Sequence, residues 1–410
     1  MHRTNVDAIP AHAAPSFDRT EGHSFARAAW ALGVGGFSIG TGEFVIMGLL
    51  PEVASDLQVT IPGAGHLISA YALGVVIGAP LLSVLAAGWR RRSLLMALMV
   101  VYAIGNFASA LAPGYLSLNL MRFPTGLPHG TYFGVAALVA AGLAPPGRRA
   151  RAVGLVMLGL TSATLVGVPI AAWLGQLWGW RAAFGFVGAI AVLAAILIGQ
   201  WVADSPAPHG ASPLRELGAL GRKQVWLTLG IGAIGLGGMF AVFSYVKPTL
   251  LEVSGLPLAG VPWVLALFGL GMVVGNLVGS RLADHSVMGS IGALLGWSAL
   301  VLITFPFMAQ HVVTASIAVF FVGTIVSVGP GLQVRLMDVA GDAQTLAAAL
   351  HHSAFNVANA LGAWLGGVAI AAGFGWISTG WVGFGLACAG LVVFAIARAS
   401  EQRAAGSTAQ

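Results

Sequence analysis

Charged residues are scarce in this sequence of 410 residues. Lys and Arg number 19 and Asp and Glu number 13, together 8% of the chain, whereas soluble globular proteins carry roughly 25%. So few charges cannot cover the surface of a water-soluble domain of this length. Hydrophobic residues make up 58% of the chain, and there are 58 glycines. This composition excludes a soluble enzyme and a disordered chain, and it predicts a helical membrane protein with many spans.

Cysteine, metal-binding clusters and nucleotide-binding loops are also lacking. Cys388 is the single cysteine, which excludes a disulfide within the chain and a cysteine-based metal site. No His or carboxylate cluster has metal-ligand spacing, and no Gly-x-x-x-x-Gly-Lys-Ser/Thr loop is present. We therefore expect no metal, no cofactor and no ATP-driven pump on this chain. Residues 1–26 lack an apolar h-region, so they are interpreted as a loose, solvated tail rather than a signal peptide.

Long apolar runs are abundant. A membrane-spanning helix needs about 20 mainly apolar residues, and the runs here are longer than the alternating ten-residue segments of a membrane β-barrel. The sequence therefore predicts an all-α membrane protein with twelve spans. They lie at about 28–50, 65–88, 93–112, 116–142, 151–175, 181–203, 225–250, 259–283, 287–309, 312–334, 345–371 and 376–398.

The basic residues are distributed unevenly between the two sets of loops. Sixteen of the 19 lie in or at the edge of the tails and every second loop, on one side of the membrane, the opposite loops contain none, and the exceptions are Arg122, Arg181 and Lys247. Cytoplasmic loops of membrane proteins collect Lys and Arg. The pattern predicts an inner (cell) membrane protein with both termini in the cytoplasm. It also argues against nucleic acid as a partner, because that needs a basic face on a soluble surface.

The second half of the chain repeats the first. LGVVIGAPLLSVLA at residues 73–86 matches LGMVVGNLVGSRLA at residues 270–283, an offset of 197, and Gly179-Trp180 recurs as Gly375-Trp376. Such a period predicts two six-helix bundles in parallel topology with a substrate site between them. The predicted organisation is a cytoplasmic N-tail (1–27), a first bundle (28–203), a cytoplasmic linker (204–224), a second bundle (225–398) and a cytoplasmic C-tail (399–410).

Five stretches carry a resemblance to a known family. They read GEFVIMGLLPEVA (42–54), IPGAGHLISAYALGVVIGAP (61–80), RFPTGLPHG (122–130), FSYVKP (243–248) and AFNVANALGAWLGG (354–367). Over about residues 28–398 the chain resembles the major facilitator superfamily. Within it, the chain is similar to the twelve-span drug:proton antiporters of the arabinose efflux permease-like branch. The resemblance implies a monomeric transporter with a central cavity lined by spans 1, 4, 7 and 10.

The family's loop motif, G-x-x-x-D-R-x-G-R-K, is only partly present. Arg90, Arg91 and Arg92 keep the basic cluster, but residues 86–89 read AAGW and lack the acid, and the repeat copy keeps an acid at Asp284. We expect these four residues to form the loop motif, although the missing acid puts its usual gate-latch role in doubt in the first half.

Glu43 is the only carboxylate well inside a predicted span. An ionised carboxylate in hydrocarbon costs at least about 2.5–3.5 kcal/mol, so such a residue usually faces a cavity and has a function. We expect Glu43 to carry the coupling proton or to pair with a cationic cargo. The alternative is a carboxylate that reaches water at the outer end of span 1 and only anchors the helix.

Two further ionisable residues in span 4 are candidates for proton coupling. The resemblance places Arg122 at a family arginine linked to coupling, and its alternative is snorkelling to the interface. His129 titrates near physiological pH and suits a proton relay, although an intramembrane histidine often only hydrogen-bonds a neighbouring helix.

The remaining candidates lie in the second half. Lys247, near the outer end of span 7, is predicted to form a gating pair with Glu43 if spans 1 and 7 approach each other. Six polar residues are candidates to line the substrate cavity, with interhelical hydrogen bonding as an equal alternative for each. They are Ser244, Tyr245, Asn276, Gln333, Asn356 and Asn359.

These features predict a secondary transporter, not an enzyme, that exports a drug-like compound, a sugar or another metabolite in exchange for protons by alternating access. Its expected partners are a small-molecule substrate, protons and the lipid bilayer, with the proton gradient as the energy source. One alternative is an uncoupled facilitator or a metabolite importer on the same fold. Another is a membrane receptor or an intramembrane enzyme, which the lack of a soluble domain and of a catalytic constellation disfavours.

Overall fold

The computed structural model describes residues 19–86, 88–143, 149–204, 218–340 and 344–408. Within these ranges all regular structure is helical. The first half contains α1 (Arg19–Phe44), η1 (Val45–Gly48), α2 (Leu50–Asp56), α3 (Ile61–Leu85), α4 (Arg91–Ala110), α5 (Tyr115–Gly126), α6 (Pro128–Leu143), α7 (Arg149–Ser162), η2 (Ala163–Gly167), α8 (Val168–Trp178) and α9 (Trp180–Trp201).

The second half has the same kind of succession. It contains η3 (Gly218–Gly221), α11 (Lys223–Gly235), α12 (Gly237–Ser244), α13 (Val246–Pro248), η4 (Thr249–Val253), η5 (Leu258–Gly260), α14 (Val261–His285), α15 (Val287–Met308), α16 (Val312–Thr324), η6 (Ile325–Ser327), α17 (Val328–Ala340), α18 (Gln344–Ala369), η7 (Ile370–Phe374) and α19 (Ser378–Thr408).

Eleven helical stretches of the described chain are long and apolar enough to cross a membrane. The predicted fourth span is the exception, because it is divided into α5 and α6 at Leu127. Pro124 and Pro128 lack the backbone N–H groups that would continue the helical hydrogen bonds across this point. The two pieces together still have the length of a full span, which completes the twelve predicted ones.

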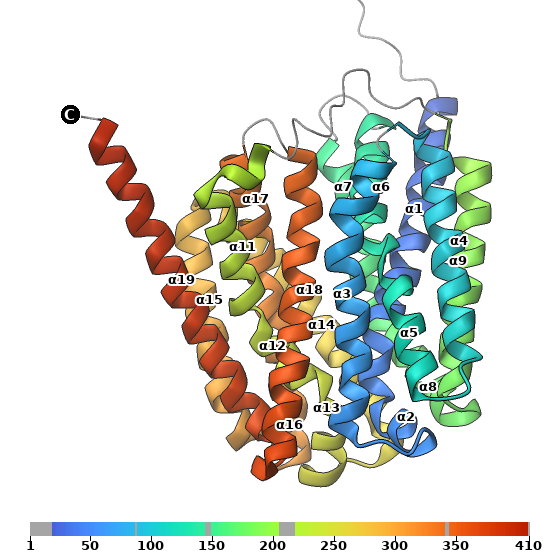
Figure 1. Ribbon diagram of the computed structural model, residues 1–410, viewed down its shortest axis with the longest axis vertical. Coiled ribbons are helices and arrows are strands. Elements are labelled where there is room, and N and C mark those ends of the chain that lie inside the picture. The colour runs from blue at the N-terminus through green and yellow to red at the C-terminus, as the bar shows by residue number, and fades with distance from the viewer. Residues whose placement is uncertain (1–18, 87, 144–148, 205–217, 341–343, 409–410) are drawn as a thin grey trace, which may run out of the picture.

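The helices form two bundles that stand side by side (Figure 1). Helix α3 of the first bundle lies against α18 of the second along most of its length, and η2 and α8 lie against α14. Helix α1 begins and α19 ends at the same end of the molecule (Figure 1). We name this the inner end, following the side predicted from the charges, and the opposite end, with α2 and α13, the outer end.

The internal repeat is visible in atomic contacts. Gly74 on α3 packs directly against the carbonyl oxygen of Phe123 on α5. Exactly the corresponding contact joins Gly271 on α14 and the carbonyl oxygen of Phe320 on α16, each residue 197 positions further along the chain. A Cβ atom at either glycine would overlap the facing backbone. The duplication seen in the sequence is therefore a duplication of helix packing, in which only glycine allows the observed approach.

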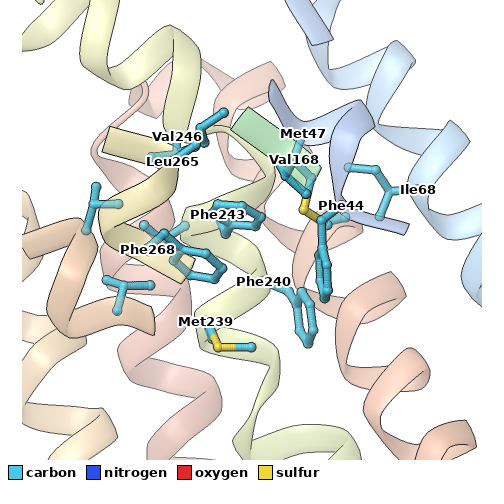
Figure 2. Packing of buried hydrophobic residues seen from close by; sticks show 14 of the residues in the cluster. Phe44, Met47, Ile68, Val168, Met239, Phe240, Phe243, Val246, Leu265 and Phe268 are labelled. Atoms are coloured by element: carbon cyan, nitrogen blue, oxygen red, sulfur yellow. The ribbon is translucent and has the colours of Figure 1, made fainter. Parts of the chain in front are cut away.

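Aromatic side chains from both bundles fill the interface between them (Figure 2). Phe44 at the end of α1 stacks on Phe240 of α12, with ring centroids 6.2 Å apart, and meets Phe243 edge-on at 6.1 Å. Phe243 in turn stacks on Phe268 of α14 at 3.6 Å. We name these four residues the aromatic seal. Each ring is buried, so the four rings close this part of the interface. Their stacked and edge-on contacts are the arrangements that aromatic pairs favour.

The helices extend further into the predicted tails than the sequence suggests. Helix α1 begins at Arg19, so residues 19–26 are helical rather than loose, and α19 continues through the predicted C-tail to Thr408. Adding residues to an existing helix is much easier than starting one, and no proline interrupts residues 19–26. Residues 1–18, Arg148 in the loop after the fourth span, most of the predicted linker (205–217) and residues 409–410 lie outside the described residues.

Candidate functional site

Glu43 lies in the interface between the two bundles. It occupies the last turn of α1, is only 2% exposed, and its carboxyl group is within reach of the side-chain amides of Asn359 and Asn356 on α18 of the other bundle. Its Oε1 atom has no hydrogen-bond partner of standard geometry among the described residues. The carboxyl group is thus held away from solvent, at a point where one bundle meets the other.

Arg122 lies beside Glu43, as the prediction that both take part in coupling requires. Its guanidinium is fully buried, donates from Nη2 to the carbonyl oxygen of Gly42 at 3.2 Å and lies over the ring of Tyr71 at 4.4 Å. It interacts electrostatically with Glu43. Its Nε and Nη1 atoms find no acceptor within the described part of the chain. A carboxyl group and a guanidinium group, both with unpartnered buried atoms, therefore form a polar centre.

His129 is connected to this centre through a residue that sequence reasoning missed. Its Nδ1 atom is 3.1 Å from the hydroxyl group of Tyr71, and the ring of Tyr71 lies under Arg122. His129 is itself 1% exposed. Tyr71 gave no signal in the sequence, because a single tyrosine in an apolar span is common. The three proton-coupling candidates, Glu43, Arg122 and His129, are therefore joined in the structure by Tyr71.

The predicted gating pair of Glu43 and Lys247 is wrong for this structure. Lys247 is fully buried on α13 and forms its ion pair with Glu52 of α2. The reason is that α1 ends at Phe44, and the chain turns through η1 into α2, which brings Glu52 to the level of Lys247. The prediction placed Glu52 in an outer loop and did not consider it.

A central cavity of about 130 Å³ lies between the bundles. It is lined by Phe44, Met157, Leu160, Thr161, Met272, Asn276, Val326, Gly329, Pro330, Gln333, His351, His352 and Phe355. Asn276 and Gln333 are the predicted cavity residues among them. Asn356 and Asn359 are instead buried beside Glu43. The hydroxyl group of Tyr245 donates to the carbonyl oxygen of Ala363 on α18 of the same bundle at 2.7 Å, and Tyr245 does not line this cavity.

The outer end carries a second, more open cavity of about 570 Å³. It is lined by residues of α2, the α8–α9 turn, α13 and η4, and it includes the pair of Glu52 and Lys247. Asp56 on its wall accepts hydrogen bonds from Arg181 Nη1 at 2.5 Å and from the indole N–H of Trp180 at 3.0 Å. These hydrogen bonds, that from Arg181 first, hold the pKa of Asp56 below its usual value.

The loop motif at the inner end is completed by a residue from elsewhere in the chain. Arg90 forms an ion pair with Asp204, which follows α9. The acid that residues 86–89 lack is thus supplied from the end of the sixth span, although both side chains are substantially exposed. Arg91 and Arg92 begin α4, and Asp284 is exposed near the end of α14. Sequence spacing alone could not reveal a partner 114 residues away.

The duplicated bundles with a buried polar centre between them agree with a sequence comparison. The sequence model of the Major Facilitator Superfamily matches residues 32–347. The chain belongs to the Major Facilitator Superfamily. It is therefore a multi-pass membrane transporter and not an enzyme, which confirms the predicted family, the predicted fold and the expectation that this chain catalyses no reaction.

Two relatives and one solved structure illustrate this membership. The inner membrane transport protein YdhP of Escherichia coli K12 is 40% identical over 349 residues, covering 84% of this chain and 89% of that protein. A chloramphenicol resistance protein of Streptomyces lividans is 35% identical, covering 81% and 86%. The fold matches the crystal structure of a bacterial homologue of the human lysosomal transporter Spinster, in an inward-facing, unoccupied conformation. That match has a TM-score of 0.65 at 15% identity, covering 94% and 96%.

Proposed function

We propose that this transporter exports a small molecule in exchange for protons, with Glu43 as the residue that carries the coupling proton. The observation that carries the proposal is the position of Glu43. It is the one buried carboxylate of the described chain, and it faces amides of the opposite bundle while Arg122 of its own bundle lies beside it. A buried ionisable group in a membrane protein with such partners is typical of a proton-translocating site.

The geometry suggests how a proton at Glu43 changes the structure. The ionised carboxylate accepts hydrogen bonds and attracts Arg122, whereas the protonated carboxylic acid has no net charge and one oxygen becomes a donor. Its neighbours Asn356 and Asn359 belong to the other bundle. Protonation therefore changes the polar interactions between Glu43 and the other bundle, which is the differential interaction that a switch between two conformations requires.

The outer end is proposed to be closed by two layers. The aromatic seal covers the outer side of the central cavity, and Phe44 of the seal also lines that cavity. Glu52 and Lys247 join the bundles nearer the outer end. Opening to the outside would separate the ion pair and the aromatic contacts, and opening to the inside would leave both intact. We therefore assign Glu52 and Lys247 as the outer gate, in place of the pair first predicted from the sequence.

The cavity lining favours a cargo without a strong charge. Its polar groups are amides, a hydroxyl and imidazoles, and the rest of the wall consists of aromatic, aliphatic and methionine side chains. Such walls suit amphipathic molecules with a few hydrogen-bonding groups. The relative named a chloramphenicol resistance protein makes chloramphenicol, a neutral aromatic amphiphile, the first compound to test. A sugar such as arabinose is the second, because the sequence resembles the arabinose efflux permease-like branch.

The test uses purified protein in proteoliposomes with an imposed pH gradient. Chloramphenicol and arabinose are assayed for transport driven by the gradient and for exchange of labelled against unlabelled compound without one. We expect Glu43→Gln to abolish gradient-driven transport and to preserve exchange, because the amide binds no coupling proton. Glu252→Gln, a carboxylate at the outer surface, is the control. Equal loss of both activities in Glu43→Gln would show a binding role instead, and unchanged gradient-driven transport would indicate that the coupling site lies elsewhere.

A further inference from the structure

Two histidines from different bundles meet beside the central cavity. The rings of His129 on α6 and His352 on α18 are 5.8 Å apart between centroids. His352 also stacks on Phe133, with an interplanar angle of 11° and a centroid distance of 5.2 Å, and Phe133 lies against His129 at 5.3 Å. Only His129 of this pair was predicted to take part in proton coupling, because nothing in the sequence places a residue 223 positions later against it.

This contact links the central cavity with the polar centre at Glu43. His352 lines the cavity. His129 contacts the hydroxyl group of Tyr71, and the ring of Tyr71 in turn contacts Arg122. On α18 the backbone carbonyl of His352 accepts a hydrogen bond from Asn356 at 3.1 Å. Asn356 and Asn359 then face Glu43. Helix α18 therefore presents His352, Asn356 and Asn359 to the first bundle in successive turns, at a spacing that keeps them on one face.

We propose that His129 and His352 form a second proton-binding site, shared between the two bundles, whose protonation weakens the contact between α6 and α18. When both imidazoles are neutral, their rings pack with Phe133 and hold this part of the interface together. When both carry a proton, each gains a positive charge, and two like charges face each other across the interface. The site is distinct from Glu43 but rests on the proposed function in taking its protons from the same gradient.

The charged and titratable groups around the pair are few. His351 neighbours His352 on α18 at 5.7 Å between ring centroids, and Tyr71 on α3 contacts His129. Arg122 on α5 lies beyond Tyr71. None of these is an acidic side chain that would neutralise a second proton at the pair. Two unit charges about 6 Å apart at an effective dielectric constant of about 20 shift a two-state population on the order of 100-fold.

The experiment measures the separation of the bundles against pH and needs no knowledge of the cargo. Spin labels are attached to Ser93→Cys and Lys223→Cys, exposed positions in the first and second halves, in a Cys388→Ser background. The full-length protein is reconstituted in lipid nanodiscs, and the distance distribution is recorded from pH 4 to pH 8, a range that extends below the ordinary titration of histidine because burial disfavours the charged imidazole. The variants are His129→Asn, His352→Asn, the double variant and His351→Asn, which lines the same cavity.

We expect the unsubstituted background to show a pH-dependent step towards longer distances at low pH. His129→Asn and His352→Asn should each lose this step, the double variant should lose no more than either, and His351→Asn should keep it. A step that is absent from the background, unchanged in His352→Asn, or lost equally in His351→Asn would overturn the proposal. Glu43→Gln separates the two hypotheses. If it keeps the step but loses gradient-driven transport, both sites stand. If gradient-driven transport survives in Glu43→Gln, only the proposed coupling role of Glu43 fails.

Discussion

The guanidinium group of Arg122 makes contacts that only its planar shape allows. It donates to the Gly42 carbonyl and at the same time covers the faces of Tyr71 and, at 5.4 Å, Phe184. Lysine keeps the charge but has neither the planar group nor the second direction for hydrogen bonding. The contacts of Arg122 therefore depend on the shape of its side chain as well as on its charge.

We expect Arg122→Lys to reduce gradient-driven transport roughly 10- to 100-fold. The reason is the loss of a hydrogen bond from a charged group, about 1.5–3 kcal/mol, in the arrangement that sets the position of Glu43. Initial rates in proteoliposomes, normalised to folded protein from size-exclusion chromatography, provide the measurement. Arg90→Lys is the matched control, because its ion pair with Asp204 is exposed. Wild-type rates in Arg122→Lys would contradict this role of the guanidinium shape.

Asp56 provides a pH prediction outside the membrane. Its pKa is lowered in the folded protein by the hydrogen bonds from Arg181 and Trp180. The ionised form therefore stabilises the fold above the unfolded-state pKa, and this stabilisation is lost as the pH falls through the folded-state pKa. We expect Asp56→Asn to be slightly less stable than wild type at pH 7, by under about 1 kcal/mol because the pair is exposed. Thermal unfolding at pH 7 and at about pH 3 should show the difference shrinking. A stability difference between Asp56→Asn and wild type that is the same at both pH values would contradict this prediction.

At the scale of helices, glycine contacts decide how closely neighbours pack. Gly74 and Gly271 each face a backbone carbonyl oxygen of the helix beside them. We expect Gly74→Ala and Gly271→Ala to destabilise the protein by about 1–3 kcal/mol each, because the added methyl group forces the backbones apart. Gly134→Ala, which meets nothing within 4 Å, is the control and should be neutral. Thermal unfolding in detergent measures all three, and equal melting temperatures would contradict the packing argument.

The helices themselves could be predicted closely, whereas only some of their interruptions have a signal in the sequence. Hydrophobic length fixes a span, so eleven of the twelve were found as long apolar helical stretches. The division of the fourth into α5 and α6 follows from two prolines that were visible in the sequence. The turn through η1 that carries Glu52 to Lys247 had no such signal, because it depends on how α1 packs against the second bundle.

The candidate site could also be predicted only in part from the sequence. Charge in a span marks Glu43 and Arg122, but the contacts of Tyr71 with Arg122 and of His352 with His129 are set by tertiary packing.

For the molecule as a whole, the ion pair of Glu52 and Lys247 joins the two bundles at the outer end. Lys247 is fully buried, so Glu52→Gln leaves an uncompensated charge, which costs about 3–5 kcal/mol. We expect this single substitution to shift the population towards an outer-open state, and Glu52→Gln with Lys247→Met to restore much of the closed state. Spin labels at Ser55→Cys and His311→Cys, exposed outer positions in the two halves, report the distance. Additive effects in the cycle would contradict the gate.

The same cycle applied to Glu43 and Lys247 distinguishes the corrected gate from the one predicted from the sequence. The structure pairs Lys247 with Glu52 and surrounds Glu43 with Arg122, Asn356 and Asn359. We therefore expect the effects of Glu43→Gln and Lys247→Met on the outer distance to add within about 0.5 kcal/mol. A strong coupling between them would indicate that the two side chains meet in another conformation of the cycle.

The duplication is structural, yet the charges of the polar centre occur in only one copy. At the offset of 197, Glu43 corresponds to Phe240 and Arg122 to Val319. With the membrane potential held at zero, a transporter that moves one proton through one carboxylate can concentrate a neutral cargo at most about tenfold per unit of pH difference. If the histidine pair carries a second proton through each cycle, the limit becomes about a hundredfold. The steady-state accumulation ratio of the cargo at a known pH difference therefore measures how many of these groups carry a coupled proton in each transport cycle.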